Sequence, residues 1–321
     1  MLKEVLSRDG TNPEGRMLRS SAMLAEGKGS DAAKEMEELS TLYPGNLGVK
    51  MALARSFLAN NDPIRAAATL EEGSLSLTTA NALGSAPITI TSGTLAFSAD
   101  QSNALVVDGT VALNPSGNPR AMNGAWSGSG SINITNTGTN LLTLGGGMST
   151  FAGDLSLGSS TGSVRLYGNT GSATTAFDLG SSTVTLHTRN GGTTINLGSL
   201  TGGTGTKLSG ASSVAGTTIF SVGATNASTT FAGSITNGSL GITAPTALAK
   251  TGTGTFTLTG NSSHTGPAAI NNGSLELLGT FGTSPVTVGA NAVLSGTGTL
   301  GGSLTTAAGG VISPGANNGA S

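Results

Sequence analysis

Two hydrophobic periods divide the chain. Within residues 1–72, apolar side chains recur at three- and four-residue spacing, which predicts amphipathic helices. Within residues 73–321 the period is two, as in Ile195-Asn196-Leu197, and Gly, Asn and Ser fill the gaps between the apolar runs. This change of period predicts a short helical segment followed by a mostly β segment, with the domain boundary between residues 72 and 73.

The helical segment contains a repeat with a period of 34 residues, in which Asn12 aligns with Asn46 and Ala32 with Ala66. Pro44 closes the first copy. In these features residues 1–72 resemble the tetratricopeptide repeat family, which binds extended peptides in a concave groove. Such a groove needs about three stacked repeats. This segment holds fewer than two, preceded by what we interpret as the last helix of another copy at Leu2–Arg8. We interpret it as an incomplete edge of a scaffold, with peptide binding as the alternative.

The β segment is predicted to be a solenoid rather than a sandwich. Gly73–Ile90 recurs as Gly273–Val288, and Thr150–Gly153 recurs as Thr230–Gly233. A sandwich would carry more large aromatic residues, but residues 76–321 contain one Trp and one Tyr. Uniform coils of about 20–25 residues, each presenting a few aliphatic side chains inward, explain this composition. We expect about ten coils, which at ~4.8 Å per coil form a rod about 50 Å long.

A second family resemblance lies towards the C-terminus. Leu248–Asn261, Ile270–Leu277 and Ser284–Val288 are similar to the autotransporter-associated β-strand repeat, also called the passenger-associated transport repeat, with weaker copies back to residue 73. The resemblance implies a right-handed parallel β-helix that is extracellular or at the cell surface of a Gram-negative-type bacterium, where the repeat assists outer-membrane passage and folding. One position departs from the family pattern: His264 stands where an aromatic residue is usual.

The N-terminal side of the chain gives no export route. Met1–Gly10 lacks the apolar core of a signal peptide, and no run approaches the ~18 apolar residues of a transmembrane helix. Gly73–Ile90 is similar to the second half of a passenger repeat, and the helical segment stands in place of the first half. We therefore interpret the chain as a fragment, a mis-started gene or a fusion of two coding pieces, with the junction near Glu71-Glu72-Gly73.

Charge and composition exclude several functions. The net charge is −2 and no cluster of Lys or Arg is present, so we expect no nucleic-acid partner. The absence of Cys excludes disulfides and thiolate metal sites. Gly296–Gly301 matches the glycine spacing of dinucleotide sites, but a strand follows it instead of a helix, so we interpret it as a turn. No catalytic, cofactor-binding or metal-binding residue is assigned.

The search for catalytic groups finds only weak candidates. Thr185, His187 and Arg189 share the outward face of one expected strand, with Asp178 near one edge of the coil. Polysaccharide-cleaving sites need paired carboxylates, or a carboxylate–metal pair with a basic residue, on adjacent coils. An isolated outward His and Arg are more typical of a solvated face, and the same holds for a lone His264. The expectation is that the protein is not an enzyme.

The leading hypothesis is a non-enzymatic structural or adhesive passenger, or stalk, of a secreted or cell-surface autotransporter-like protein. In this hypothesis, the outward Ser and Thr ladders either keep the surface of the rod hydrated or bind a partner, which would be a glycan or a host-surface polymer. The alternatives are a tetratricopeptide protein-binding scaffold with a β-solenoid appendage and a carbohydrate-active β-helix. If the β segment is cut from a longer solenoid, its last coils around Gly302–Ile312 expose an unpaired edge, and we expect end-to-end self-association.

Overall fold

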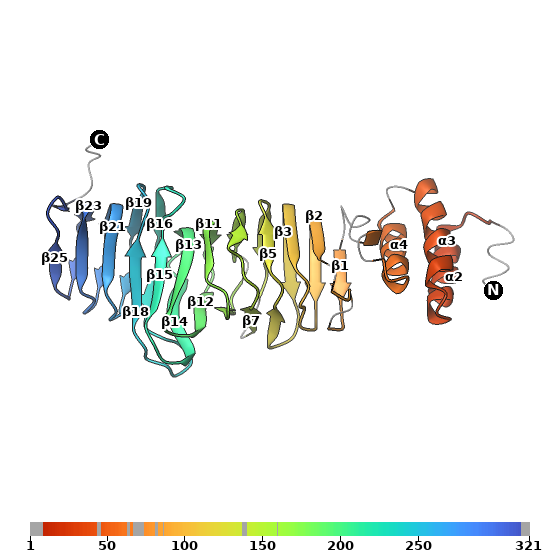
Figure 1. Cartoon of the computed structure of the whole chain (residues 1–321), viewed down its shortest axis with the longest axis horizontal. Coiled ribbons are helices and arrows are strands. Elements are labelled where there is room, and N and C mark those ends of the chain that lie inside the picture. Colours follow the sequence, from red (N-terminus) through yellow and green to blue (C-terminus); the bar gives the residue numbers. More distant parts are fainter. Residues whose placement is uncertain are drawn as a thin grey trace.

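The chain folds into a rod of stacked β-coils with helices at its N-terminal end (Figure 1). The computed structural model describes residues 9–43, 46–62, 65–66, 74–80, 83–85, 87–136, 140–158 and 160–315. Within them the strands form a parallel β-solenoid of about 11 turns. This confirms the predicted fold class and lies close to the expected ten coils. The helix expected at Leu2–Arg8 and the junction expected near Glu71–Gly73 lie outside the described residues.

Three helices in the described part precede the solenoid: α2 (Pro13–Ala25), α3 (Gly29–Leu42) and α4 (Leu47–Ala59). Asparagine side chains cap two of them, because Asn12 Oδ1 accepts from the Gly15 N–H at 2.8 Å and Asn46 Oδ1 accepts from the Val49 N–H at 3.2 Å. Each cap satisfies a backbone donor that the first turn of a helix leaves free. Because Asn12 and Asn46 are aligned in the sequence repeat, the same helix start occurs twice.

The largest sheet, here the first sheet, turns a corner along the rod. It contains seventeen of the described strands. They are β1 (Ser74–Leu77), β2 (Ile88–Phe97), β3 (Leu105–Pro115), β5 (Trp126–Gly128), β6 (Ser131–Ile134), β8 (Thr150–Phe151), β9 (Asp154–Ser156), β11 (Gly171–Asp178), β13 (Thr193–Thr201), β15 (Thr218–Val222), β16 (Thr229–Phe231), β18 (Thr246–Lys250), β19 (Thr255–Leu258), β21 (Ala268–Leu277), β23 (Val286–Gly296), β25 (Leu304–Thr306) and β26 (Val311–Pro314).

Two shorter sheets follow one another along a further face of the rod. The second sheet contains β4 (Arg120–Met122), β7 (Leu141–Leu144), β10 (Ser163–Leu166), β12 (Thr185–Asn190), β14 (Lys207–Val214) and β17 (Ser234–Thr236). The third sheet contains β20 (Asn261–Ser262), β22 (Thr280–Phe281) and β24 (Thr299–Leu300). The Ile235 N–H donates to Ser262 Oγ at 3.1 Å, so β17 of the second sheet contacts β20 of the third.

Coil length varies along the rod. Ile88 pairs with Leu105, whereas Phe220 pairs with Leu248, so the coil that begins at Ile88 is much shorter than the one that begins at Phe220. The additional residues are placed at corners and loops, while the paired strands keep their alternation of inward and outward side chains. The solenoid therefore tolerates insertions without losing its core.

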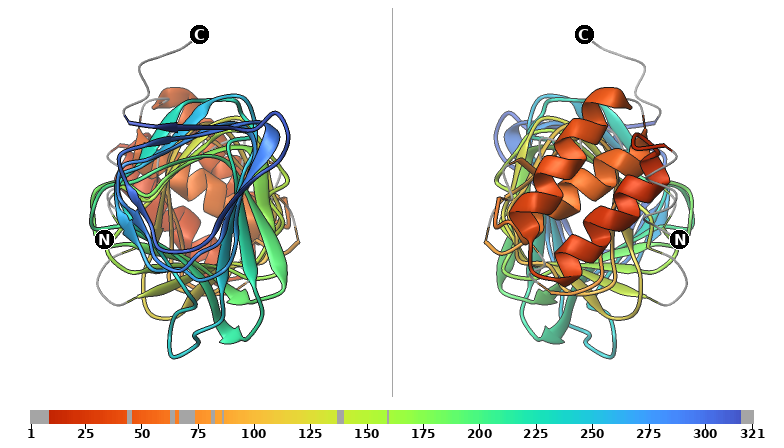
Figure 2. Two further views of the ribbon diagram at one scale, coloured as in Figure 1. Left: turned by 90° about the vertical axis from the view of Figure 1, so that its left-hand side faces the viewer. Right: turned by 90° about the vertical axis from the view of Figure 1, so that its right-hand side faces the viewer.

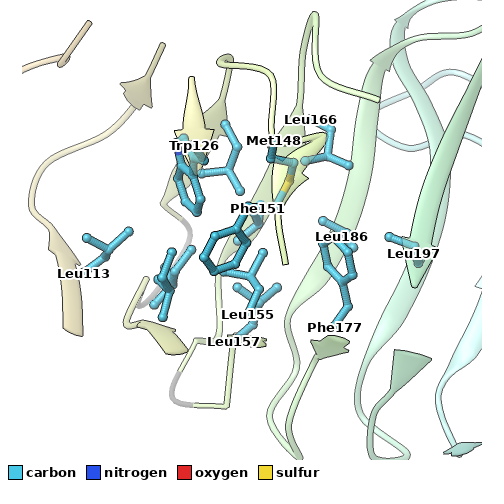
Figure 3. Packing of buried hydrophobic residues seen from close by; sticks show 14 of the residues in the cluster. Leu113, Trp126, Met148, Phe151, Leu155, Leu157, Leu166, Phe177, Leu186 and Leu197 are labelled. Carbon is cyan, nitrogen blue, oxygen red and sulfur yellow. The ribbon is translucent and has the colours of Figure 1, made fainter. Parts of the chain in front are cut away.

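The interior consists of stacks in which an inward apolar side chain recurs at the same position of successive coils. One stack on the first sheet contains Val111, Ile132, Leu155, Phe177 and Leu200, which are register partners in neighbouring strands. All five are buried, and Figure 3 shows part of this packing. Burial of one such side chain contributes about 1.5–3 kcal/mol. Each coil is stabilised by the coils on both sides of it.

Glycine is required where two corners approach closely. The register between β2 and β3 shifts at a corner of the first sheet. A Cβ atom at Gly109 would lie 1.6 Å from the carbonyl oxygen of Thr91 in the preceding coil. No side chain fits at that distance, so part of the high glycine content reflects the close stacking of corners.

The helices cover the N-terminal end of the rod, as the view along its axis shows (Figure 2). Phe57 of α4 and Ala66 belong to the same continuous buried apolar cluster as Leu75 and Leu77 of β1. The helical segment and the solenoid therefore share one hydrophobic core. Whether residues 1–72 bind a peptide stays a prediction.

Candidate functional site

Charged side chains are separated by sheet along the solenoid. In the described strands of the first sheet the outward charged residues are acidic, and in those of the second sheet they are basic. The acidic set is Asp108, Asp154, Asp178 and Glu276; the basic set is Arg120, Arg165, Arg189 and Lys207. The second sheet, which lies where β7, β12 and β14 are labelled in Figure 1, therefore has a positive outer face.

Two arginines and an aromatic ring meet on this outer face. Leu166 of β10 pairs with Thr188 of β12, so the next residues of the two strands, Tyr167 and Arg189, are neighbours. The guanidinium carbon of Arg189 lies 4.4 Å from the centre of the Tyr167 ring, which is a cation–π contact. Tyr167 is 41% exposed, whereas the Trp and Phe side chains of the described strands are buried. It is the aromatic side chain that this face offers to solvent.

The cations of this face have no acidic partners among the described residues. Arg165 Nη2 donates to Thr143 Oγ1 at 2.9 Å, and burial together with the nearby Arg189 lowers the pKa of Arg165 from its ordinary value. Arg165, Arg189 and Lys207 form no ion pair within the described part of the chain, where the ion pairs lie in the helical segment. The positive charge of the face is therefore not compensated by neighbouring carboxylates.

His187 lies on the same face but is only 1% exposed. It is flanked by its register partners, Arg165 of β10 and Ser209 of β14. Its Nδ1–H donates to the carbonyl oxygen of Thr188 at 3.2 Å, and its Nε2 has no hydrogen-bond partner. Burial lowers the pKa of His187 to about 4, with a smaller contribution from Arg165. The ring is therefore neutral at pH 7.

A pocket opens beside Tyr167, at the corner where the second sheet meets the first. At this corner, four residues separate Leu166 from Gly171. In the next coil, seven residues separate their register partners, Thr188 and Asn196. The corner of the later coil is therefore three residues longer. Between the two corners lies a pocket of about 250 Å³. Its polar lining consists of Tyr167, Asn169, Thr170, Thr188, Asn190 and Thr193.

Asn169 is a buried polar residue of this pocket with an incomplete set of hydrogen bonds. Its side chain is 4% exposed, and its Oδ1 accepts from the Gly171 N–H at 2.8 Å. Its Nδ2 has no hydrogen-bond partner. A buried amide donor without a partner costs about 1–3 kcal/mol, so an acceptor supplied by water or by a ligand would be stabilised at this point.

Further along the rod, a lysine lies inside the core. Lys250 is 1% exposed and occupies the inward position that is Val222 in the preceding coil and Ile270 in the following one. Its methylene stem therefore replaces one aliphatic side chain of a stack. Snorkelling of this kind keeps the stem in apolar surroundings and takes the ammonium to polar ones.

The Lys250 ammonium ends among carbonyl oxygens at a corner. Nζ donates to Thr251 O at 2.6 Å, to Gly252 O at 2.9 Å and to Asn272 O at 3.1 Å. Burial lowers the pKa of Lys250 to about 8, so the group stays charged at pH 7 and uses all three of its donors. Because Asn272 belongs to the next coil, the ammonium holds two successive corners together.

Residues 248–277, which begin with this lysine strand, match the family model of the passenger-associated-transport-repeat. This segment is a passenger-associated transport repeat. The repeat runs from Leu248 within β18 to Leu277 at the end of β21, and it is paired with β15 on one side and with β23 on the other. The match confirms the resemblance seen in the sequence for these residues. No curated protein and no solved structure matches the chain.

A histidine lies in the core of the repeat. His264 is fully buried, and its ring stands edge-on to Phe281 with 4.9 Å between the ring centres. Neither ring nitrogen has a hydrogen-bond partner, and burial lowers the pKa of His264 to about 4. The imidazole thus packs in the core of the repeat as a neutral aromatic ring.

The structure brings together some of the residues considered from sequence and separates others. Thr185, His187 and Arg189 do share the outer face of β12, but Asp178 lies in the first sheet. There its Oδ1 accepts from the Gly180 N–H and from Thr201 Oγ1. The carboxylate therefore does not pair with the basic residues of β12.

Sequence analysis missed Arg165, Tyr167, Asn169 and Lys207. A signal for three of them exists in the local coil period, which aligns Arg165 with His187, Tyr167 with Arg189 and Thr185 with Lys207. Asn169 gives no such signal, because it lies at a corner where the period changes.

The described residues contain no cluster of three His, Asp or Glu side chains placed to hold a metal ion. None of the helices in the described ranges is long and apolar enough to cross a membrane. The repeat and the solenoid together fit an autotransporter passenger-like domain.

The last described coils form a second candidate surface. A groove of about 270 Å³ there is lined mainly by Leu277, Leu294, Leu300, Leu304 and Ile312. Leu304 and Ile312 are 38% and 44% exposed, and no charged residue occurs between Val286 and Gly315. This end of the rod is apolar and uncharged, whereas helices cover the other end.

Proposed function

We propose that the protein is a non-enzymatic structural or adhesive passenger, or stalk, that works outside the cell or at the cell surface of a Gram-negative-type bacterium. The observation that carries this proposal is the passenger-associated transport repeat at residues 248–277, built without interruption into a longer solenoid. A repeat associated with passenger transport, placed within a passenger-like rod, supports an exported domain whose work is extension or attachment.

The arrangement of carboxylates supports the non-enzymatic part of the proposal. Asp154 and Asp178 point outward from adjacent strands of the first sheet. Each accepts a hydrogen bond from a hydroxyl of a neighbouring coil, Asp154 from Ser131 at 3.1 Å and Asp178 from Thr201 at 2.8 Å. These contacts tie coils together and explain both carboxylates without a catalytic role.

Location is tested on intact cells that produce the full protein. Cells are treated with protease, and antibodies raised against the purified chain follow its loss. We expect degradation on intact cells, or recovery of the chain from the medium, while a cytoplasmic marker stays intact. Protection from protease until the cells are lysed would reject the surface assignment.

The absence of catalysis is tested separately. Purified protein is incubated with a panel of neutral and acidic polysaccharides, and new reducing ends or unsaturated products are measured. We expect no product above that of a heat-treated sample. An activity that disappears in Asp154→Asn or Asp178→Asn would reject the non-enzymatic proposal and favour the carbohydrate-active alternative.

We also propose self-association through the last coils. The apolar groove and the exposed Leu304 and Ile312 support it. Because helices cover the opposite end, association gives pairs rather than long filaments. Light scattering should show dimers that Leu304→Lys/Ile312→Lys abolishes. The control Leu240→Lys changes an exposed loop position and should leave the dimer intact; a monomer at all concentrations would contradict the proposal.

A further inference from the structure

We propose that the outer face of the second sheet, over β10, β12 and β14, binds an acidic polysaccharide, with sugar carboxylates contacting its cations. This deepens the adhesive role and rests on the proposed function. We call this face the basic face and define it by Arg165, Tyr167, Arg189 and Lys207.

The basic face carries positive charge that no ion pair in the described part of the chain compensates. The three cations of the basic face lie on adjacent strands, which are about 4.8 Å apart, and no ion pair involving them is found in the described part of the chain. Arg165 and Arg189 repel one another, and this repulsion adds to the effect of burial, which is the larger cause of the lowered pKa of Arg165. By register, Lys207 lies beside Thr185, two positions before the row of Arg165 and His187, and Arg189 lies two positions after that row. The cations are therefore staggered across three successive coils, and a polyanion that crosses the strands relieves the repulsion between the two arginines.

The side chains of the basic face also indicate which chemical groups the ligand carries. Tyr167 is exposed and lies against Arg189, so the face combines an aromatic surface with a guanidinium. Arginine binds planar carboxylates through two parallel hydrogen bonds, and an aromatic ring packs against the apolar face of a sugar. A carboxylated sugar satisfies both groups together, whereas a simple inorganic anion satisfies the arginine alone.

The corner pocket beside Tyr167 offers space and polar groups for part of the ligand. Its volume of about 250 Å³ is below the roughly 300–1,000 Å³ of sites for whole small molecules, so it suits one sugar unit of a longer chain. Asn169 Nδ2 is a buried donor without a partner, and Thr170, Asn190 and Thr193 add polar groups. Hydroxyl groups, which donate and accept, match this lining better than phosphate oxygens, which only accept.

These features favour a polysaccharide over nucleic acid and over anionic membranes. Tight binding to nucleic acid uses many clustered phosphate contacts, and the basic face offers three cations. On β10, β12, β14 and the residue that follows β10, the large exposed apolar side chains are Tyr167 and Val214, which are too few for insertion into a bilayer.

The test measures binding of a galacturonic acid oligomer to the full chain by calorimetry, at low and high salt. The matched probe is the methyl-esterified oligomer, which has the same backbone without the charge. We expect saturable binding of the acid oligomer that weakens with salt, and at least about tenfold weaker binding of the ester. No saturable binding of the acid oligomer, or equal binding of the two forms, would overturn the proposal.

Variants locate the site. Arg189→Gln/Lys207→Gln removes two surface charges and should weaken binding of the acid oligomer at least about tenfold. The control Lys34→Gln/Arg55→Gln makes the same charge change on the helices and should bind as the unaltered chain does. Equal loss in both pairs would overturn the proposal by showing a non-specific charge effect.

Tyr167→Ala tests the sugar contact independently of charge. We expect it to weaken the acid oligomer and the ester by a similar factor, because the ring contacts the sugar and not the carboxylate. Unchanged binding of both would remove the aromatic contact from the proposal. DNA and phosphatidylglycerol vesicles serve as competitors, and competition at equal charge concentration would show a general anion surface and overturn the polysaccharide assignment.

This experiment also separates the inference from the proposed function. Binding is measured on the purified protein and does not depend on where the protein resides. Failure of binding with a surface location retained would reject only the polysaccharide, whereas protease protection in cells with binding retained would reject only the location.

Discussion

The solenoid interior differs between two regions, the part from β3 to β13 and the passenger-associated transport repeat. Both regions are built from the same kind of coil, but different side chains fill them. The first is lined by an unbroken stack of apolar side chains from Val111 to Leu200. The second places Lys250 and His264 in comparable buried positions. The comparison teaches that one coil geometry accommodates both kinds of side chain: apolar side chains stack continuously, while buried polar groups add fixed contacts between corners and a dependence on pH.

The largest expected effect tests the apolar stack. Phe177→Ala leaves a cavity between Leu155 and Leu200 and should lower the free energy of unfolding by about 3–5 kcal/mol, measured by denaturant unfolding. Leu278→Ala is the matched control, because Leu278 is 40% exposed and its truncation should cost less than about 0.5 kcal/mol. Similar losses in both variants would contradict the stacked core.

The second prediction tests the buried imidazole. The pKa of His264 is about 4 in the folded protein and about 6.5 in an unfolded chain. The unfolded state therefore binds more protons between these values, and stability that is complete above pH 6.5 is lost as the pH falls towards 4. The full loss is on the order of 3 kcal/mol.

His264→Phe replaces the imidazole with an aromatic ring that does not titrate and keeps the edge-on contact with Phe281. The variant should match the unaltered protein at pH 7.5 within about 1 kcal/mol and be more stable at pH 4.5. The dependence of stability on pH that remains in this variant comes in part from His187, whose pKa is also about 4. Parallel stability curves from pH 7.5 to pH 4.5 would show that His264 does not titrate as described.

The third prediction concerns the lysine of the repeat. Lys250→Met keeps the stem within its stack but removes three N–H···O bonds to Thr251, Gly252 and Asn272. We expect a loss of about 2 kcal/mol and faster hydrogen exchange at the corner of residues 271–273. Unchanged exchange there would mean that the ammonium does not hold the two coils together.

The smallest effect is expected on the basic face. Tyr167→Ala removes an exposed ring and its contact with Arg189 and should cost about 0.5–1 kcal/mol in the free energy of unfolding. Thermal unfolding measures this change. A loss as large as that of Phe177→Ala would show that Tyr167 is part of the core and not a surface group.

Much of the architecture follows from residues whose role does not depend on distant partners. The period of two in Val164-Arg165-Leu166 decides which side chains point inward, and the two asparagine caps begin helices through contacts three residues away. The resemblance at Leu248–Leu277 also lies in local sequence, and the family match confirms it. These features are readable because they involve neighbours along the chain.

The outer surface is different, because its composition depends on coil length. Arg165 lies beside His187, and Tyr167 beside Arg189, only because of the length of the coil that separates them. Other coils of the rod are shorter or longer than this one. A change in the length of one coil would move every later outward residue to new neighbours without disturbing the inward pattern.

The sequence by itself therefore determined the helical start, the β-solenoid and the transport repeat, because alternation and short motifs are local. Only the tertiary structure decided that acidic residues gather on one sheet and basic residues on another, and that a three-residue difference between corners opens the pocket around Asn169. Those outcomes depend on register between coils, which is fixed by corner geometry and backbone pairing between residues that are far apart in the chain.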